Sequence, residues 1–161
     1  AASGAGAATT LGLAGDAWAD RAGGTSGALW GVALRAWGSA LGDADAARAA
    51  DVGRGAEAAL TAITDLGGAR PGDKTLVDAM VPFVEALGAG ITAGLDLAQA
   101  WSKAADRATL AAEGTAKLRP RLGRARPLAE RSLGHPDAGA TSLALCARVV
   151  ADRLSTRRRQ V

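Results

Sequence analysis

Glycines and hydroxyl groups are concentrated at Gly23-Gly24-Thr25-Ser26-Gly27, directly before a segment with helical periodicity. Backbone N–H groups at the start of a helix are unpaired and lie at the positive end of its dipole, so this loop can bind an anion such as a phosphate. It lacks the spacing of a Walker loop. A Gly-Gly turn with Thr or Ser as N-cap is also ordinary helix punctuation, so the loop alone leaves both interpretations open.

Two further glycine-containing segments could meet a ligand. Residues 67–76, with the sequence GGARPGDKTL, place a glycine turn and a helix start within ten positions, which taken alone is a helix connection. Residues 119–139 hold three of the five prolines, five arginines and the single histidine. Guanidinium groups suit bidentate contacts with phosphate. Asp137, near the end of this segment, could simply be a helix N-cap.

Taken in order, the segments AGGTSGAL, PGDKTLVDA and GRA…ERSLGHPDAGA resemble the nucleotide-binding domain of the dihydroxyacetone kinase family, and the resemblance covers nearly the whole chain. It implies an eight-helix antiparallel barrel with ADP or ATP at one open end, and phosphoryl transfer to a short ketose such as dihydroxyacetone. The family commonly has Met and Pro where this chain has Leu76 and Ala138. The implied roles are phosphate binding for Thr25, Ser26 and Arg124, and contact with adenine and ribose for Gly67, Leu76, Asp137, Ala138 and Gly139.

The same resemblance implies partners. The ketose would be held by a separate dihydroxyacetone-binding domain or subunit, and the parent enzyme is expected to be a dimer. Two phosphate sources stay open: direct use of ATP, or ADP kept as a bound carrier and recharged by a phosphotransferase-system phosphocarrier. The acceptor stays open as well, because a triose and a tetrose would be distinguished by residues outside this chain.

The family binds paired Mg²⁺ through an acidic loop, Gly-Asp-x-Asp-x-Gly, that lies before the phosphate loop. Nothing before Gly23 fits this pattern. Gly42-Asp43-Ala44-Asp45 falls after the phosphate loop, so we expect a turn there that leads to the third helix, with Asp43 as its N-cap. Phosphoryl transfer depends on metal ions that neutralise charge on the phosphates. We therefore expect an N-terminally truncated domain with its Mg²⁺ ligands upstream, no catalytic or metal residue of its own, and little kinase activity alone. The rival function is a non-catalytic helical regulatory or interaction module that retains the nucleotide pocket.

Helices must position these motifs. Apolar residues at three-and-four spacing predict an all-α fold of about six helices. Gly67-Gly68 should end the third helix, Asp73 should cap the fourth, and Pro82 could bend it. The first helix has no capping residue ahead of it in the sequence. The expected helices lie within residues 1–22 and at about 29–41, 45–66, 76–87, 91–116 and 139–156, and 119–139 is expected to be a long loop.

Composition sets the remaining expectations. The 161 residues are 48% hydrophobic but only 3% aromatic, which fits one helical domain over 1–161. The net charge of +3 comes largely from arginines at 119–131 and in a solvated basic tail, 157–161. Basic residues are not interleaved with aromatic ones, and no apolar run approaches the roughly 20 residues of a membrane span. We expect a cytoplasmic protein that binds neither nucleic acid nor membrane, with Cys146 and the four tryptophans in the core and His135 in a turn.

Overall fold

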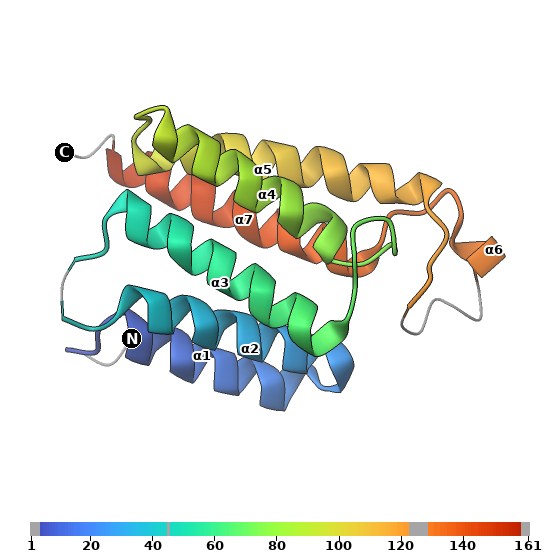
Figure 1. Ribbon diagram of the computed structural model, residues 1–161, viewed down its shortest axis with the longest axis horizontal. Coiled ribbons are helices and arrows are strands. Elements are labelled where there is room, and N and C mark those ends of the chain that lie inside the picture. Colours follow the sequence, from blue (N-terminus) through green and yellow to red (C-terminus); the bar gives the residue numbers. More distant parts are fainter. Residues whose placement is uncertain (1–3, 45, 123–128, 159–161) are drawn as a thin grey trace. The chain divides into compact units, whose positions relative to one another are not determined.

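The computed structural model describes residues 4–44, 46–122 and 129–158. Every regular element in these ranges is helical, so the predicted all-α class is confirmed (Figure 1). The chain divides into two compact units, Ala1–Gly68 and Ala69–Val161, and consecutive long helices run antiparallel within each. The first unit contains α1 (Ala7–Ala22), α2 (Gly24–Leu41) and α3 (Ala49–Gly67). The second contains α4 (Val77–Thr92), α5 (Leu97–Gly114), the 3₁₀ turn η1 (Thr115–Lys117), α6 (Ala129–Ser132) and α7 (Ala138–Arg158).

Helices α1 and α2 pack closely because glycines lie at their interface. A Cβ atom on Gly31 would lie 3.2 Å from the carbonyl oxygen of Gly15, and one on Gly38 would lie 3.0 Å from that of Ala8. Glycine inside a helix costs about 1 kcal/mol relative to alanine. Here that cost permits a close approach of the two backbones that larger side chains would prevent.

The start of α1 is capped by the segment that follows α2. The Asp43 carboxylate accepts hydrogen bonds from the N–H of Thr9 at 3.0 Å and from its hydroxyl at 2.6 Å. The Gly42 carbonyl accepts one from the N–H of Ala8 at 3.0 Å. The hydroxyl of Thr9, and then its N–H, lower the pKa of Asp43. The expectation that Asp43 caps the third helix is therefore wrong, because the hairpin returns this residue to α1.

Helix α3 begins at Ala49, about one turn later than the predicted start at 45. It packs against α2, where a Cβ atom on Gly55 would overlap the indole ring of Trp37. Ile63, one turn from the end of α3, is buried. The core of the first unit thus consists mainly of small residues with one large ring set against a glycine.

In the second unit, α5 packs against both α4 and α7. Its buried face is rich in alanine, and Trp101 is the large side chain on that face. The Trp101 ring meets Phe83 edge-on with ring centroids 5.0 Å apart, and its Nε1 donates a hydrogen bond to the Ala147 carbonyl at 2.9 Å. This single side chain therefore connects all three long helices of the unit.

The fifth helix begins later than predicted. Asp96 is its N-cap, accepting a hydrogen bond from the N–H of Gln99 at 2.9 Å, so Ile91 belongs to α4 and Leu95 to the intervening turn. Gly94, with a φ of 77°, permits that turn. No described helix is both long enough and apolar enough to span a bilayer.

Candidate functional site

The predicted phosphate loop lies at the start of α2. Gly23 and Gly24 have φ values of 61° and 60°, which lets the chain turn from α1 into α2 within two residues. Thr25 and Ser26 follow in the first turn of α2, and both are exposed. Neither hydroxyl caps the helix. Because amides in a first helical turn lack intrahelical acceptors, this end presents N–H groups and hydroxyls together, as anion binding requires.

Gly67 is the last residue of α3, in the same unit. Gly68 follows in the left-handed conformation, φ 65°, and donates its N–H to the Thr64 carbonyl at 2.8 Å, so the predicted glycine stop is confirmed. A Cβ atom on Gly67 would lie 3.1 Å from a methyl carbon of Leu29 on α2. The glycine therefore allows the end of α3 to lie against α2.

The turn before α4 is organised by Asp78 and not, as predicted, by Asp73. The Asp78 carboxylate accepts hydrogen bonds from the N–H groups of Gly72 at 2.5 Å and Thr75 at 2.7 Å. Asp73 instead accepts from the N–H of Arg70 at 2.9 Å, inside the turn. Helix α4 therefore begins at Val77, because the acid in its first turn reaches back to the preceding amides.

Three of the predicted base-lining residues meet in the second unit. Leu76 is 6% exposed. A Cβ atom on Gly139 would lie 3.3 Å from the Cβ of Leu76 and 3.0 Å from a carboxylate oxygen of Asp137. Ala138, the first residue of α7, is exposed. The structure thus brings Leu76, Asp137 and Gly139 into one contact group with a glycine backbone at its centre.

Asp137 is also the N-cap of α7, as its position suggested. Its carboxylate accepts a hydrogen bond from the N–H of Ala140 at 2.8 Å, while its own N–H donates to the hydroxyl of Thr115 at 2.7 Å. Burial raises the pKa of Asp137, and hydrogen bonds from the N–H groups of Ala140 and Gly139 oppose that rise. The capping and ligand-binding roles are compatible, since one carboxylate can accept several hydrogen bonds.

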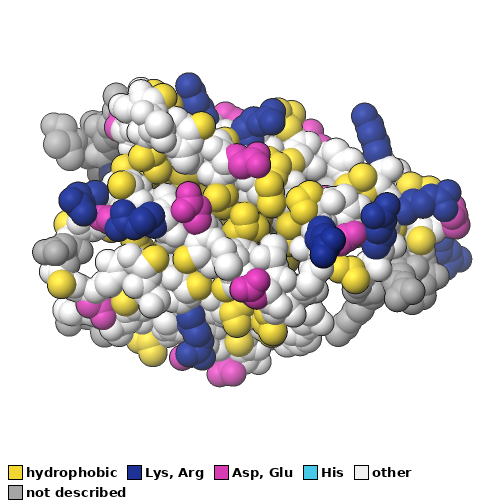
Figure 2. All heavy atoms as spheres, viewed as in Figure 1, with side chains coloured by type: hydrophobic (Ala, Val, Ile, Leu, Met, Phe, Trp, Pro, Cys, Tyr) yellow, Lys and Arg dark blue, Asp and Glu magenta, His cyan; other side chains and the backbone are white. Residues whose placement is uncertain are grey.

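The long loop predicted for 119–139 contains a short helix, α6. Arg119 pairs with Glu130 on α6 at 2.5 Å, and Arg121 lies 3.9 Å from Asp73. These arginines therefore lie beside acidic side chains, and the face in Figure 2 likewise shows basic side chains interspersed with acidic ones. Arg124 lies in 123–128, outside the described residues, so its predicted phosphate contact stays a prediction.

Expectations from the sequence also concern His135, the tryptophans and Cys146. His135 is exposed at a bend, as predicted. Trp101 is buried, but Trp18 is 38% exposed and stacks on Trp30 with ring centroids 5.0 Å apart, so its expected place in the core is wrong. Cys146 is half-buried, and burial raises its pKa. Amphipathic helices built from alanine leave few positions where a ring as large as indole is fully covered.

Sequence reasoning missed three polar residues around this contact group: Lys74, Asp78 and Thr115. Lys74 is 3% exposed and Thr115 is 1% exposed. Both lie beside turns, where periodicity gives no sign of burial. A signal was available only for Asp78, which stands in the first turn of a helix after two glycine-containing turns, the usual place for an acid that bonds to backbone N–H groups.

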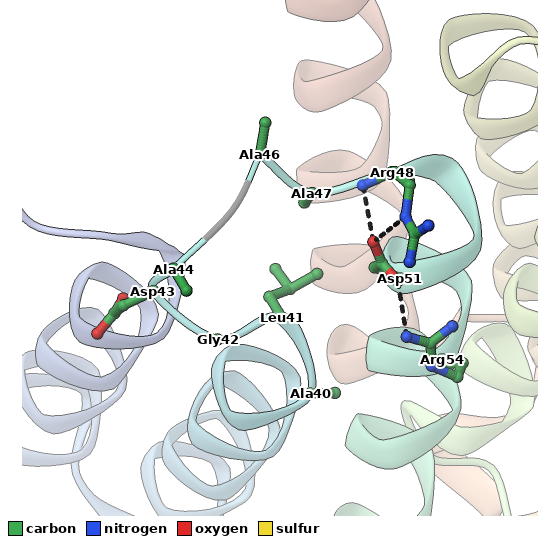
Figure 3. Close-up of a pocket in the computed structure, with 10 residues that line it drawn as sticks. All are labelled: Ala40, Leu41, Gly42, Asp43, Ala44, Ala46, Ala47, Arg48, Asp51 and Arg54. Atoms are coloured by element: carbon green, nitrogen blue, oxygen red, sulfur yellow. Dashed lines mark hydrogen bonds and ion pairs between the residues drawn. The ribbon is translucent and has the colours of Figure 1, made fainter.

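A separate pocket of about 430 Å³ lies between the end of α2 and the start of α3 (Figure 3). Asp51 lies between two guanidinium groups there. Its carboxylate accepts hydrogen bonds from Arg48, through the N–H at 2.9 Å and Nε at 3.2 Å, and from Arg54 at 2.6 Å. The bond from the Arg48 N–H is the main cause that lowers the pKa of Asp51 to about 2. Because the charges of Arg48, Asp51 and Arg54 pair with one another, we interpret this cluster as one that stabilises the start of α3.

This pKa predicts a defined acid sensitivity. A carboxyl with a lowered folded-state pKa stabilises the fold above its unfolded pKa of 3.8 and loses that contribution as the pH falls toward 2. Asp51→Asn should therefore lower the urea midpoint at about pH 6, and the difference from the unsubstituted protein should vanish near pH 2. Asp65→Asn, an exposed position on the same helix, is the control. A difference that does not depend on pH would contradict the assignment.

Comparison with known proteins places this chain in a family. The chain matches the DAK2 domain over residues 1–152. It is 56% identical over 149 residues to D-erythrulose kinase of Mycolicibacterium smegmatis, covering 92% of this chain and 26% of that protein. It is 55% identical over 141 residues to L-erythrulose kinase of Pectobacterium atrosepticum, covering 88% and 24%.

A shorter match joins the chain to a nucleotide-binding subunit. It is 46% identical over 77 residues to the ADP-binding subunit DhaL of the PEP-dependent dihydroxyacetone kinase of Escherichia coli, covering 48% of this chain and 37% of that protein. The chain spans about a quarter of the length of the two erythrulose kinases. The match over residues 1–152 and the high identity to these kinases show that the chain belongs to the DAK2 domain family, a member of the dihydroxyacetone kinase group that its sequence resembles.

Proposed function

We propose that this chain is the ATP- or ADP-binding domain of a short-chain ketose kinase. The observation that carries the proposal is the identity of 56% over 92% of the chain to an enzyme named D-erythrulose kinase. A second relative of similar identity is named L-erythrulose kinase, which favours a four-carbon ketose over dihydroxyacetone as the acceptor. The acceptor hydroxyl would attack the terminal phosphoryl group of ATP, releasing ADP and a ketose phosphate.

The resemblance to the dihydroxyacetone kinase family supplies the residue roles in this proposal. Thr25 and Ser26 offer hydroxyls and unpaired amides to the phosphates. The resemblance gives Arg124 a phosphate-binding role as well. The Leu76–Asp137–Gly139 contact group, with Ala138, is proposed to recognise the base and ribose, and the resemblance gives Gly67 a role at the adenine. Leu76 is 6% exposed and lies against Gly139, so it supports this backbone from the core side, and the absence of a side chain on Gly139 lets Leu76 and the Asp137 carboxylate pack closely there.

The Mg²⁺ that the family implies is not assigned to this chain. The described residues contain no group of three or more acidic, histidine or cysteine side chains that could hold a metal ion. The Asp43 carboxylate is occupied by Thr9, so it does not fit the role of a ligand. The part that we propose for this chain in catalysis is to hold the nucleotide in a fixed orientation.

The parent enzyme needs a part that binds the ketose. The chain spans about a quarter of the erythrulose kinases, and its Escherichia coli relative is named as one subunit of a larger enzyme. We propose that a ketose-binding domain or subunit is the partner, in a dimeric cytoplasmic enzyme. A phosphotransferase-system phosphocarrier belongs to the proposal only if ADP stays bound between turnovers.

Calorimetric titration with ADP, with and without Mg²⁺, tests the proposal. Thr25→Val combined with Ser26→Ala should weaken ADP binding by roughly 10- to 150-fold, since hydrogen bonds to charged groups contribute about 1.5–3 kcal/mol. Thr61→Val is the matched control, because that hydroxyl bonds to the Glu57 carbonyl on the exposed side of α3. If the unsubstituted chain does not bind ADP, the proposal is overturned, and the rival function as a helical interaction module is favoured.

A further inference from the structure

Lys74 is held in an unfavourable environment. Among the described residues it is the one non-glycine residue with a positive φ, 61°, a conformation that L-residues adopt at an energetic cost. Its side chain is 3% exposed, and a buried ammonium group is costly unless its donors are satisfied. The surrounding structure must compensate for both costs.

The compensation comes from two backbone carbonyls far apart in the sequence. Lys74 Nζ donates one hydrogen bond to the carbonyl of Ser132 at 2.6 Å and one to that of Leu118 at 3.2 Å. The Asp78 carboxylate fixes the turn around Lys74 by accepting from the N–H groups of Gly72 and Thr75 on either side of it. The ammonium therefore joins Leu118 to Ser132, and a hydrogen bond from the Arg121 N–H to the Asp73 carbonyl at 3.1 Å adds a second link between this turn and the segment that follows Leu118.

These contacts form the last step of a ladder between residues 115–118 and 132–137. The N–H of Asp137 donates to the Thr115 hydroxyl at 2.7 Å, and the N–H of Gly134 donates to the Ala116 carbonyl at 2.9 Å. Lys74 then bridges Leu118 and Ser132. The pairs run in antiparallel order, so the Lys74 bridge sets the register in which the chain arrives at Asp137 and the start of α7.

We propose that Lys74 is a positioning residue for nucleotide recognition, because its ammonium holds segment 132–137 in register and so places Asp137 and Gly139 against Leu76. The inference rests on the proposed function, since it assigns the nucleotide to that contact group. An ammonium has three donors on a long stem, and here two of them meet carbonyls from separate segments. A methionine fills similar space without any donor.

Two measurements on Lys74→Met test this role. ADP affinity should fall at least tenfold at a temperature where circular dichroism shows the helices intact. Limited trypsin digestion should cut after Arg121 and Arg131 several-fold faster than in the unsubstituted protein. Both arginines lie in the sequence between Leu118 and Ser132, the residues whose carbonyls Lys74 bridges. Leu87→Ala is the control: it removes a fully buried side chain of α4 and lowers stability, but should leave ADP affinity and these cleavage rates unchanged at that temperature.

The outcomes separate the two ideas. If the unsubstituted protein binds ADP and Lys74→Met binds it equally well, the positioning role is refuted while the proposed function stands. If Leu87→Ala loses as much affinity as Lys74→Met, Lys74 contributes general stability only, and the inference is again refuted. If the unsubstituted protein binds no ADP, the proposed function itself fails, and the inference that rests on it fails too, even where digestion confirms the bridge.

Discussion

Gly139→Val is expected to weaken ADP binding by roughly 5- to 150-fold, the equivalent of the about 1–3 kcal/mol that overpacking costs. A Cβ atom at this position would lie 3.0 Å from the Asp137 carboxylate and 3.3 Å from the Cβ of Leu76, and valine adds two methyl groups beyond it. The carboxylate must then move from the end of α7, or the backbone must retreat. Both movements distort the proposed base-binding group directly.

The measurement is calorimetric titration with ADP, with circular dichroism to verify the helices. Gly88→Val is the matched control, because a Cβ on Gly88 meets nothing within 4 Å and the residue lies in α4 of the same unit. We expect its ADP affinity to be unchanged. Equal binding by the Gly139 variant and the unsubstituted protein would remove this glycine from the nucleotide site.

Of the substitutions proposed for this chain, Trp101→Ala should produce the largest loss of stability, about 3–5 kcal/mol in the free energy of unfolding. The indole ring packs on Phe83 of α4 and donates to the Ala147 carbonyl of α7, so its removal leaves a cavity between three helices and abolishes that hydrogen bond. Urea unfolding followed by circular dichroism measures the loss. This probe does not depend on tryptophan fluorescence, which the substitution itself changes.

Two variants separate the contributions of Trp101. Trp101→Phe keeps a ring but loses the N–H donor, so it should cost clearly less than the alanine variant. Trp18→Ala removes a tryptophan that is 38% exposed and stacked on Trp30, and should cost less again. If Trp18→Ala were as damaging as Trp101→Ala, the core of the second unit would not depend on the indole ring as described.

The helices could be predicted from the sequence because their signals are local. Apolar residues at helical spacing identified the six long helices of the described residues, and Gly67-Gly68 correctly marked the end of α3. The errors concern acidic residues near helix ends. Aspartate is a common N-cap residue, so Asp43 and Asp73 were each expected to cap the helix that follows. The N–H group that a carboxylate accepts from depends on how the chain folds back, and Asp43 accepts from an N–H 34 positions away.

The candidate site was predictable only in part. The roles of Thr25, Gly67 and Gly139 came from the family resemblance and stay predictions, although each residue stands at a turn or helix end that the sequence itself marks. Lys74 carried no such signal, since a lysine in a polar turn is usually exposed. Its burial follows from carbonyls contributed by residues 44 and 58 positions later, which no local pattern encodes.

The bonds from Gly42 and Asp43 to the start of α1 also bear on how the first unit folds. A first helical turn is the costly step of helix formation, and here its cap comes from the far end of the next helix. Ordering of that turn and closure of the α1–α2 hairpin are therefore one cooperative event. Hydrogen exchange at the amides of Ala8 and Thr9 consequently reports the opening free energy of the hairpin, where a helix end would ordinarily report only local fraying.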